Sequence, residues 1–579
     1  MERLKTYFWR YRTRYFWGAL CLFGTATLIM WIPWWIREAI RIIEQGGPVQ
    51  DVTFYVWVIG LAAVLQGVIR TFSRAFIFNA GRDIEYDLRN DLFAHLQKLS
   101  VSYYQSQRTG DLMSRVINDI SAVRLLLGPG ILNLVNAPLY YLYALILMLS
   151  IDVRMTLAAL LPYPVLIWAV RNFRGKVLKT SLKVQQQMSE LSSHVQENLS
   201  GMHVVKAYTQ EQNQINQFAE LNRDYQEKSM ELARLRGVVG PFMQAISGLT
   251  VLIVLGYGGL RVMRGDLFVA DIVAFIAYLN VLAWPTAAFG WMISLVERGR
   301  AAMGRLEEIF KAQPEITSPP APLSLENSAR NIEFHNVWFS YDRKADGQAV
   351  LKDISFTLPE GRMLGIVGRT GSGKSTLAQL LPRLYDATSG RVCYGGKDIR
   401  MLSLSELRKT IGFVPQDSFL FSTSLHRNLT YGCDGVADQE LNDVIRLTRL
   451  DRDLEIFPKG VDTIVGERGI TLSGGQKQRA TLARALLLDP PVLVLDDCLS
   501  SVDAQTEDEI LKGLRSVLKG KTCMIISHRI SAVKEADEIL VLDDGEVIER
   551  GNHQELVRRG GLYADLFHQQ QLTEELERI

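Results

Sequence analysis

Residues 131–149, ILNLVNAPLYYLYALILML, form an apolar run that carries no charged side chain on any face. A helix needs about 20 predominantly apolar residues to cross a bilayer. The alternative, a large soluble core of helices, would place charges along one face of each helix. The sequence therefore predicts an all-α transmembrane domain of six helices, at residues 15–43, 52–78, 128–150, 153–170, 237–262 and 267–296.

The start of the chain, MERLKTYFWRYRTR, is basic and aromatic. It carries five Lys or Arg residues against one acid, and this balance favours a cytosolic N-terminus. Six crossings would return the C-terminal half to the cytosol as well. Residues 1–14 form either an interfacial helix that lies in the headgroup layer or the aromatic flank of the first span, and the residues alone leave both open.

The composition changes after residue 305. Residues 306–330 are rich in Pro and Ser and predict a linker, and residues 331–579 have the strand and helix patterns of a globular domain. The formal net charge of +2 gives no global basic balance, so we expect no nucleic-acid partner. The predicted parts are an interfacial segment at 1–14, a membrane domain at 15–305, a linker at 306–330 and a globular domain at 331–579.

The globular domain contains a phosphate-binding pattern, GRTGSGKST, between a predicted strand and a predicted helix. Its glycines allow backbone N–H groups to surround phosphates, Lys374 can neutralise the β- and γ-phosphates, and Ser375 can ligate Mg²⁺. The pattern predicts a site for nucleotide phosphates with Mg²⁺. Its candidate residues are Gly368, Thr370, Gly371, Ser372, Gly373, Lys374, Ser375 and Thr376.

Two further strands are predicted to end on polar side chains. The run PPVLVLDDCLS reads as a buried strand that ends at Asp496, which can reach Mg²⁺, and the next acid, Asp497, can orient or deprotonate the attacking water. The run TCMIIS leads to His528, which either contacts the γ-phosphate or is a surface loop residue.

A second anion-binding surface is predicted at LSGGQ, residues 472–476, where a helix begins. One phosphate chain does not need two such surfaces in one domain. We therefore expect this surface to serve a nucleotide that another copy holds. Its candidate residues are Ser473, Gly474, Gly475 and Gln476.

The motif order GRTGSGKST, FVPQD, LSGGQ, LVLDD, SSVD and SHR resembles the α/β P-loop ATPase domain, with its helical subdomain, of ABC transporters. The six predicted spans ahead of it are similar to exporter half-transporters of that family, in the cell's inner (plasma) membrane. The resemblance implies that two ATPase domains pair head to tail around two ATP molecules. Each site would then combine the P-loop of one subunit with the LSGGQ of the other.

The resemblance also implies roles for single residues. Tyr341 matches the aromatic residue that stacks on adenine, Gln416 the residue that reaches Mg²⁺ and the attacking water, and Asp503 the acid that crosses to the partner. The segment GERG matches the exporter loop that touches the coupling helices, through Glu467, Arg468 and Gly469. The stretches from Tyr103 and from Gly201 resemble those that hold the two cytosolic coupling helices.

Asp497 departs from the family pattern, which has Glu at this position. One methylene fewer withdraws the carboxylate by roughly 1.5 Å, whereas a general base must lie within about 2.6–3.2 Å of its proton. Loss of such a base slows a reaction by about 10²- to 10⁴-fold. A homodimer would thus have two slow sites, and a heterodimer would have one slow site and one fast site on a partner that carries Glu. Family precedent favours the heterodimer.

The function predicted from these motifs is ATP-driven export of hydrophobic or amphipathic compounds, such as drugs, peptides or lipids, by alternating access. The implied partners are a second half-transporter, the lipid bilayer and the substrate. Two alternatives remain open. One is a homodimeric lipid flippase or exporter, and the other is a non-pumping membrane protein that ATP binding gates or regulates.

Overall fold

The computed structural model describes residues 2–325, 329–342, 349–433, 435–466 and 472–577. The chain folds into two compact units. The first comprises Met1–Gln97 and Thr109–Ala312, and the second comprises Lys98–Arg108 and Gln313–Ile579. Each unit has its own core.

The first unit is built from helices. They are α1 (Glu2–Arg10), α2 (Arg12–Glu44), α3 (Val49–Leu96), α5 (Thr109–Ser114), α6 (Ile120–Leu125), α7 (Ile131–Ile151), α8 (Val153–Leu160), α9 (Tyr163–Ser200), α10 (Met202–Ala207), α11 (Glu211–Met263) and α12 (Val269–Lys311). Two π-helical turns, Arg115–Asp119 and Leu126–Gly130, join α5, α6 and α7 into one continuous run.

Five helices or helix runs in the described chain are long and apolar enough to cross a membrane: Arg12–Glu44, Val49–Leu96, Thr109–Ile151, Glu211–Met263 and Val269–Lys311. The span predicted at 153–170 is not one continuous helix. It breaks between α8 and α9, after Leu160, where Pro162 and Pro164 have no N–H to donate to the preceding turn. The segment is apolar and helical on both sides of the break.

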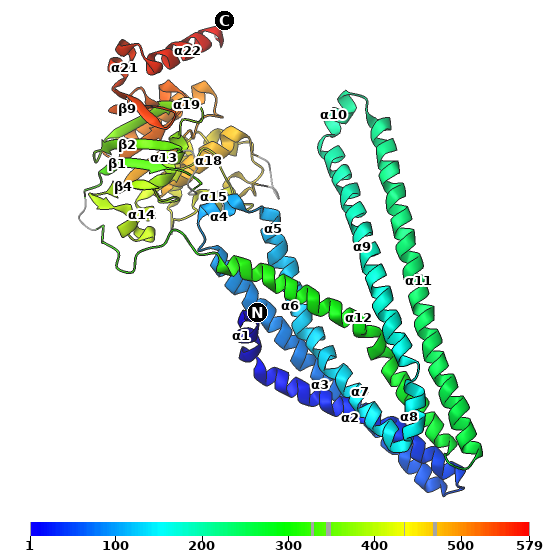
Figure 1. Cartoon of the computed structure of the whole chain (residues 1–579). Helices are drawn as coiled ribbons and strands as arrows, with labels where there is room; N and C mark the ends of the chain where they lie inside the picture. Colours follow the sequence, from blue (N-terminus) through cyan, green and yellow to red (C-terminus); the bar gives the residue numbers. More distant parts are fainter. Residues whose placement is uncertain (1, 326–328, 343–348, 434, 467–471, 578–579) are drawn as a thin grey trace. The chain divides into compact units, whose positions relative to one another are not determined.

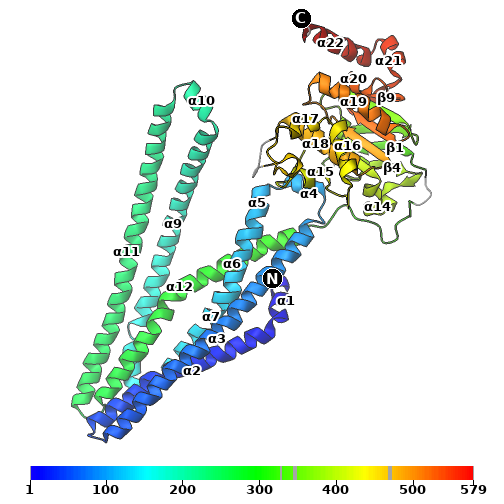
Figure 2. The same ribbon diagram turned by 180° about the vertical axis from the view of Figure 1, so that it is seen from behind.

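The long helices α9 and α11 form a pair. In both views α9 and α11 lie side by side, and the short helix α10 connects them at one end (Figures 1 and 2). The helix α10 occupies the stretch from Gly201 that resembles a coupling helix. Its residues Met202 and Val204 are exposed, as is the following Tyr208.

The N-terminal segment is a separate helix, α1, which ends at Arg10 before α2 begins. Its side chains bond to two acidic residues that lie one turn apart on α3. The Tyr7 hydroxyl donates to Asp91 at 2.5 Å, and Arg10 pairs with Asp87 at 2.7 Å. The segment is therefore a helix distinct from α2, and its location in the headgroup layer stays a prediction.

The second unit contains two sheets. A four-stranded antiparallel sheet has the order β2-β1-β4-β5, and a six-stranded sheet has the order β10-β9-β3-β8-β7-β6. In the larger sheet every neighbouring pair is parallel except β10 with β9. The strands are β1 (Ile332–Phe339), β2 (Leu351–Leu358), β3 (Met363–Gly368), β4 (Ser389–Tyr394), β5 (Lys397–Asp398), β6 (Ile411–Val414), β7 (Val492–Asp496), β8 (Thr522–Ile526), β9 (Glu538–Asp543) and β10 (Glu546–Gly551).

Helices cover these sheets, and Figure 1 shows α18 and α19 beside the strands. The helices of this unit are α4 (Val101–Ser106), α13 (Lys374–Leu380), α14 (Leu404–Lys409), α15 (Leu425–Leu429), α16 (Asp438–Leu447), α17 (Asp451–Leu454), α18 (Gly474–Leu487), α19 (Ala504–Leu518), α20 (Ile530–Val533), α21 (His553–Arg559) and α22 (Leu562–Glu577). Two short 3₁₀ turns lie at Ile399–Met401 and Gly460–Asp462. The buried β3, β7 and β8 form the centre of the parallel sheet.

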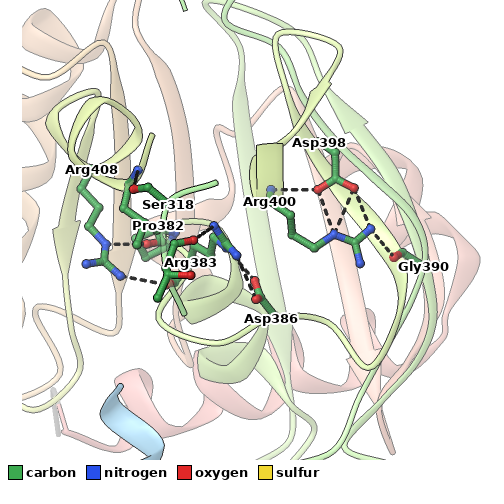
Figure 3. A network of polar contacts seen from close by, with 10 residues as sticks. Ser318, Pro382, Arg383, Asp386, Gly390, Asp398, Arg400 and Arg408 are labelled. Atoms are coloured by element: carbon green, nitrogen blue, oxygen red, sulfur yellow. Dashed lines mark hydrogen bonds and ion pairs between the residues drawn. The ribbon is translucent and has the colours of Figure 1, made fainter. Parts of the chain in front are cut away.

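The segment 306–330 differs from a free linker. Helix α12 continues to Lys311 and so includes the first part of it. Beyond the helix, the Thr317 carbonyl accepts from the Arg383 guanidinium at 3.1 Å, and the Ser318 hydroxyl accepts from the N–H of Leu404 at 3.0 Å. Figure 3 shows this network, in which Arg383 also pairs with Asp386. The part of this segment from Gln313 onward therefore belongs to the second unit, and Thr317 and Ser318 are hydrogen-bonded to other residues of that unit.

Candidate nucleotide-binding site

The parallel sheet brings the predicted motifs to one edge. Pairing places Asp496 beside Ile526 and Val414 beside Leu495, while β3 lies on the other side of β8. The segments that leave this edge therefore carry the P-loop, His528, Asp496 and Gln416. The carboxyl edge of an open α/β sheet is where such folds bind ligands.

The P-loop has the geometry that its glycines predict. A Cβ at Gly368 would lie 2.1 Å from the carbonyl oxygen of Leu542, so no larger residue fits there. Gly373 has a φ of 95°, a left-handed conformation, immediately before α13 begins at Lys374. The loop therefore turns sharply enough for successive N–H groups to face one ligand.

Lys374 is buried inside this loop. Its Nζ donates to the carbonyls of Gly368 at 2.9 Å and Arg369 at 2.7 Å. Burial lowers the pKa of the Lys374 ammonium, and the negative charges of Asp497 and Asp496 partly oppose that change. A cation held this way is ready to exchange carbonyl oxygens for phosphate oxygens.

Asp496 lies at the end of β7 with 1% of its surface exposed, and its Oδ1 accepts from the Ser375 hydroxyl at 3.0 Å. Burial, reinforced by the nearby Asp497 charge, raises the pKa of Asp496 to about 6. A bound cation would favour its ionised form again. The Asp496 and Ser375 oxygens therefore fit Mg²⁺, whose remaining ligands are usually waters and substrate phosphates. Consistently, the described residues contain no cluster of three or more acidic, His or Cys side chains that could hold a metal alone.

Asp497 is also buried, with a backbone φ of 47°. Asp adopts this left-handed conformation more readily than most residues. The Asp497 Oδ1 accepts from the backbone N–H of His528 at 3.5 Å, and the Asp497 N–H donates to the Ile526 carbonyl at 2.8 Å. The short carboxylate thus faces the backbone of the loop after β8.

His528 is close enough to Lys374 and Asp497 for their charges to affect it. Burial lowers the pKa of His528, Lys374 lowers it further, and Asp497 partly offsets both. The imidazole is therefore predominantly neutral at pH 7, and can donate or accept one hydrogen bond at each nitrogen.

Tyr341 lies against the P-loop helix. Its hydroxyl shares a hydrogen bond of 3.0 Å with that of Thr376, and its ring contacts those of Phe339 and Tyr385 edge to face. The Tyr341 side chain remains half exposed. Gln416 is exposed just beyond β6, in a loop whose next residue, Asp417, is close enough to raise the pKa of Asp496.

The LSGGQ residues open α18. The Ser473 hydroxyl accepts from the N–H of Gln476 at 3.3 Å, and the Gln476 carboxamide accepts from the N–H of Ser473 at 2.9 Å. A Cβ at Gly475 would lie 2.8 Å from the carbonyl oxygen of Ser501. In the described part of the chain, these residues contact Ser501 and Asp453 and are not grouped with the P-loop.

Sequence reasoning missed Gln478, which joins the LSGGQ helix to the loop before Asp503. Its carboxamide donates to the Ser500 hydroxyl and accepts from the N–H of Ser501, both at 2.8 Å. Gln478 is buried on the face of α18 that also buries Thr481 and Leu482. The signal available in the sequence was a polar residue on the helix face that also carries apolar residues.

Asp503 caps α19 and accepts from the N–H of Thr506 at 2.9 Å. Backbone hydrogen bonding at Thr506 lowers the pKa of Asp503, so its exposed carboxylate is ionised at neutral pH. The stretch from Tyr103 includes most of α4, whose Ser102 donates to Glu315 at 3.0 Å. The predicted loop residues Glu467, Arg468 and Gly469 lie outside the described residues.

Comparisons with known proteins agree with this architecture. Residues 15–286 match the ABC transporter transmembrane region, and residues 351–500 match the ABC transporter ATPase family. A probable multidrug resistance ABC transporter ATP-binding/permease protein of Bacillus subtilis, YheI, is 36% identical over 99% of this chain and 98% of its own length. The multidrug resistance-like ATP-binding protein MdlA of Escherichia coli is 34% identical over 99% of this chain and 97% of its own length.

An ATP-dependent lipid A-core flippase of Syntrophus aciditrophicus is 31% identical over 89% of this chain and 85% of its own length. Among solved structures, a bacterial Atm1-family ABC exporter with ATP bound superposes with a TM-score of 0.78. It is 28% identical and covers 96% of this chain and 98% of that one. The chain therefore belongs to the ABC transporter family, as a multi-pass membrane protein that fuses an exporter-type transmembrane region to an ATP-hydrolysing domain.

Proposed function

We propose that the chain is one half of an exporter that uses ATP to move hydrophobic or amphipathic compounds across the plasma membrane by alternating access. The observation that carries this proposal is the grouping of Lys374, Ser375 and Asp496 at one sheet edge, in a chain that also holds the membrane helices. The names of two relatives, which refer to multidrug resistance, support the substrate class. Both termini would be cytosolic.

The residues of the P-loop would bind ATP through its phosphates. Backbone N–H groups from Gly368 to Thr376, together with Lys374, would surround the phosphates, and the Tyr341 ring would stack on adenine. Ser375, Asp496 and Gln416 would hold Mg²⁺, which neutralises charge that develops on the transferred phosphoryl group.

The same edge supports binding better than hydrolysis. Asp497 would orient the attacking water, with His528 at the γ-phosphate, yet the Asp497 carboxylate is directed to the backbone N–H of His528. A base displaced by about 1.5 Å would lose much of the 10²- to 10⁴-fold that such a group contributes. We therefore propose a slow site on this chain.

A slow site fits a heterodimer. The LSGGQ surface of this chain, with Asp503, would complete a fast site whose P-loop belongs to a different half-transporter with Glu at the matching position. The exposure of Ser473 at a helix N-terminus supports this assignment, since it leaves the surface open to a nucleotide from outside the domain.

The partner can be tested with two differently tagged copies of this chain, expressed together in the native host. For a heterodimer, capture through one tag should bring down a distinct half-transporter and none of the other tag. Recovery of both tags in one active complex would contradict the heterodimer and support a homodimer.

A homodimeric lipid flippase is the second candidate, favoured by the flippase relative and by the intact LSGGQ and His528. Proteoliposomes can separate the candidates, with accumulation of a hydrophobic cationic dye and inward movement of a labelled phospholipid as the two readouts. The exporter proposal predicts ATP-dependent movement of the dye, lost in Lys374→Ala. Movement of lipid alone would indicate a flippase. ATP binding without movement of either probe would indicate a non-pumping regulatory protein.

A further inference from the structure

The backbone around His528 is joined to the C-terminal helix by two hydrogen bonds. The carboxamide Nε2 of Gln570, on α22, donates to the His528 carbonyl at 2.5 Å. The Oε1 of the same side chain accepts from the N–H of Ile530 at 2.8 Å. One side chain therefore bridges the backbone on both sides of Arg529, using its donor and its acceptor.

Packing determines where Gln570 lies. Tyr563, two helical turns earlier on α22, is fully buried, and its hydroxyl bonds to the His553 ring at 2.8 Å. Leu566 and Phe567 pack into the same core as Ile530. Because residues seven positions apart share a helix face, the core that buries Tyr563 also presents Gln570 to the loop.

The loop is held on its other sides as well. Arg529 forms an ion pair with Glu507 of α19, which is 4% exposed, and the N–H of Arg529 donates to the Ser527 hydroxyl at 3.0 Å. The N–H of His528 faces the Asp497 carboxylate. The two faces of the His528 backbone therefore contact different elements: Asp497 at the N–H and Gln570 at the carbonyl.

We propose that Gln570 is a positioning residue for His528. By holding the His528 carbonyl and the Ile530 N–H, it keeps the imidazole directed at the nucleotide, so the C-terminal helix contributes to catalysis without touching ATP. This inference rests on the proposed role of His528 at the γ-phosphate. Misplacement of a catalytic group by about 1 Å can slow a reaction about 10²-fold, so removal of the bridge has a measurable effect.

The test uses the full-length transporter in lipid nanodiscs. If a partner subunit co-purifies, its P-loop is disabled by substitution, so that kcat reports only on the ATP bound to this chain. Gln570→Ala removes both hydrogen bonds, and Gln570→Met removes them while it keeps the side-chain volume. The matched control is Gln571→Ala, on the next, exposed position of α22. We expect both Gln570 variants to lower kcat about 10-fold while the Kd for ATP stays within about twofold, and the control to do neither. A normal kcat in Gln570→Met would overturn the inference.

A double-mutant cycle separates positioning from general stabilisation. If Gln570 acts through His528, then Gln570→Met should have no further effect on turnover in a His528→Ala background. An equal further loss in that background would show that Gln570 acts elsewhere and would overturn the inference. Unchanged turnover in His528→Ala would defeat the proposed role of His528 and this inference with it. A loss in His528→Ala with normal turnover in both Gln570 variants would defeat this inference alone.

Discussion

The P-loop edge and the LSGGQ surface both offer helix N-termini to an anion, but they treat charge differently. At the P-loop edge, Lys374 and Asp496 are buried and their pKa values are shifted toward the neutral forms. At the LSGGQ surface, Ser473 is exposed and its polar groups are satisfied by Gln476. A charged ligand would therefore stabilise the charged forms of Lys374 and Asp496 at the P-loop edge. The LSGGQ surface has its hydrogen bonds satisfied without a ligand.

This difference indicates separate contributions to one cycle. The P-loop edge should determine how tightly this chain binds its own ATP and Mg²⁺. The LSGGQ surface should determine turnover at a site it completes for another subunit, with little effect on the ATP bound to its own chain. The variants that follow test whether the two regions contribute separately to ATP binding and to turnover.

The largest effect is expected at Lys374. In Lys374→Ala, photolabelling of this chain by azido-ATP should weaken about 100-fold, because charge-assisted hydrogen bonds to phosphate contribute about 1.5–3 kcal/mol each. The control is Lys521→Ala, which removes a Lys that pairs with Asp489 ahead of β8 and β7, at the opposite edge of the sheet. Unchanged labelling in Lys374→Ala would show that the P-loop edge does not bind ATP.

A smaller effect, on turnover, is expected at Gly475. The added Cβ in Gly475→Ala would displace the Ser501 backbone and misalign the surface that faces the partner's nucleotide. ATP turnover of the assembled transporter should fall about 100-fold, as it does when one stabilising donor is lost, while ATP labelling of this chain stays within about twofold. Gly304→Ala, in α12 with open space around the new methyl group, should behave as wild type. An equal loss of labelling would mean that the two regions are one site.

In the absence of nucleotide, the free energy of unfolding should depend on the charge of Asp496. Its pKa is about 6 in the folded protein, above its ordinary value of 3.8, so the folded state holds more protons between these pH values. The free energy of unfolding therefore falls as the pH rises from 3.8 to about 6, and the total loss is up to roughly 3 kcal/mol. Asp496→Asn keeps an acceptor for Ser375 without the buried charge. Its melting temperature should exceed that of wild type at pH 8, and the difference should vanish near pH 4.

Asp508→Asn serves as the control for this prediction, because Asp508 is exposed on α19 and its pKa is lowered by a hydrogen bond from Lys512. It should give no increase in melting temperature at pH 8. A melting temperature of Asp496→Asn that equals wild type at pH 8 would show that the Asp496 charge is not destabilising in the folded protein.

The sequence predicted the fold class and family because its signals were local. Apolar length predicted the membrane helices, and the glycines with Lys374 lie between a strand and a helix, a context that only a phosphate loop fits. Composition was less informative at Pro162, where an apolar segment breaks, and after residue 305, where α12 continues to Lys311. Neither the break nor the extension changes the apolar content of the segment.

Residues that act through tertiary placement were not predictable. Gln478 and Gln570 are single polar residues on helices, and their hydrogen bonds depend on loops 22 to 42 positions away in the chain. The direction of the Asp497 carboxylate depends on how β7 and β8 align, which places the N–H of His528 beside it. The identity of Asp497 was visible in the sequence, but its contact was not.

The most direct test of the central claim is the ATP turnover of Asp497→Glu in the purified full-length transporter, with the P-loop of any different partner subunit disabled so that only the ATP bound to this chain is hydrolysed. Adding one methylene should bring the carboxylate to the attacking water and raise kcat several-fold, with the Kd for ATP unchanged. The gain stays below the full 10²- to 10⁴-fold of a general base, because the left-handed backbone at this position suits Asp better than Glu. An unchanged or lower kcat, with ATP still bound, in either a homodimer or a heterodimer, would contradict the claim that Asp497 makes this site slow.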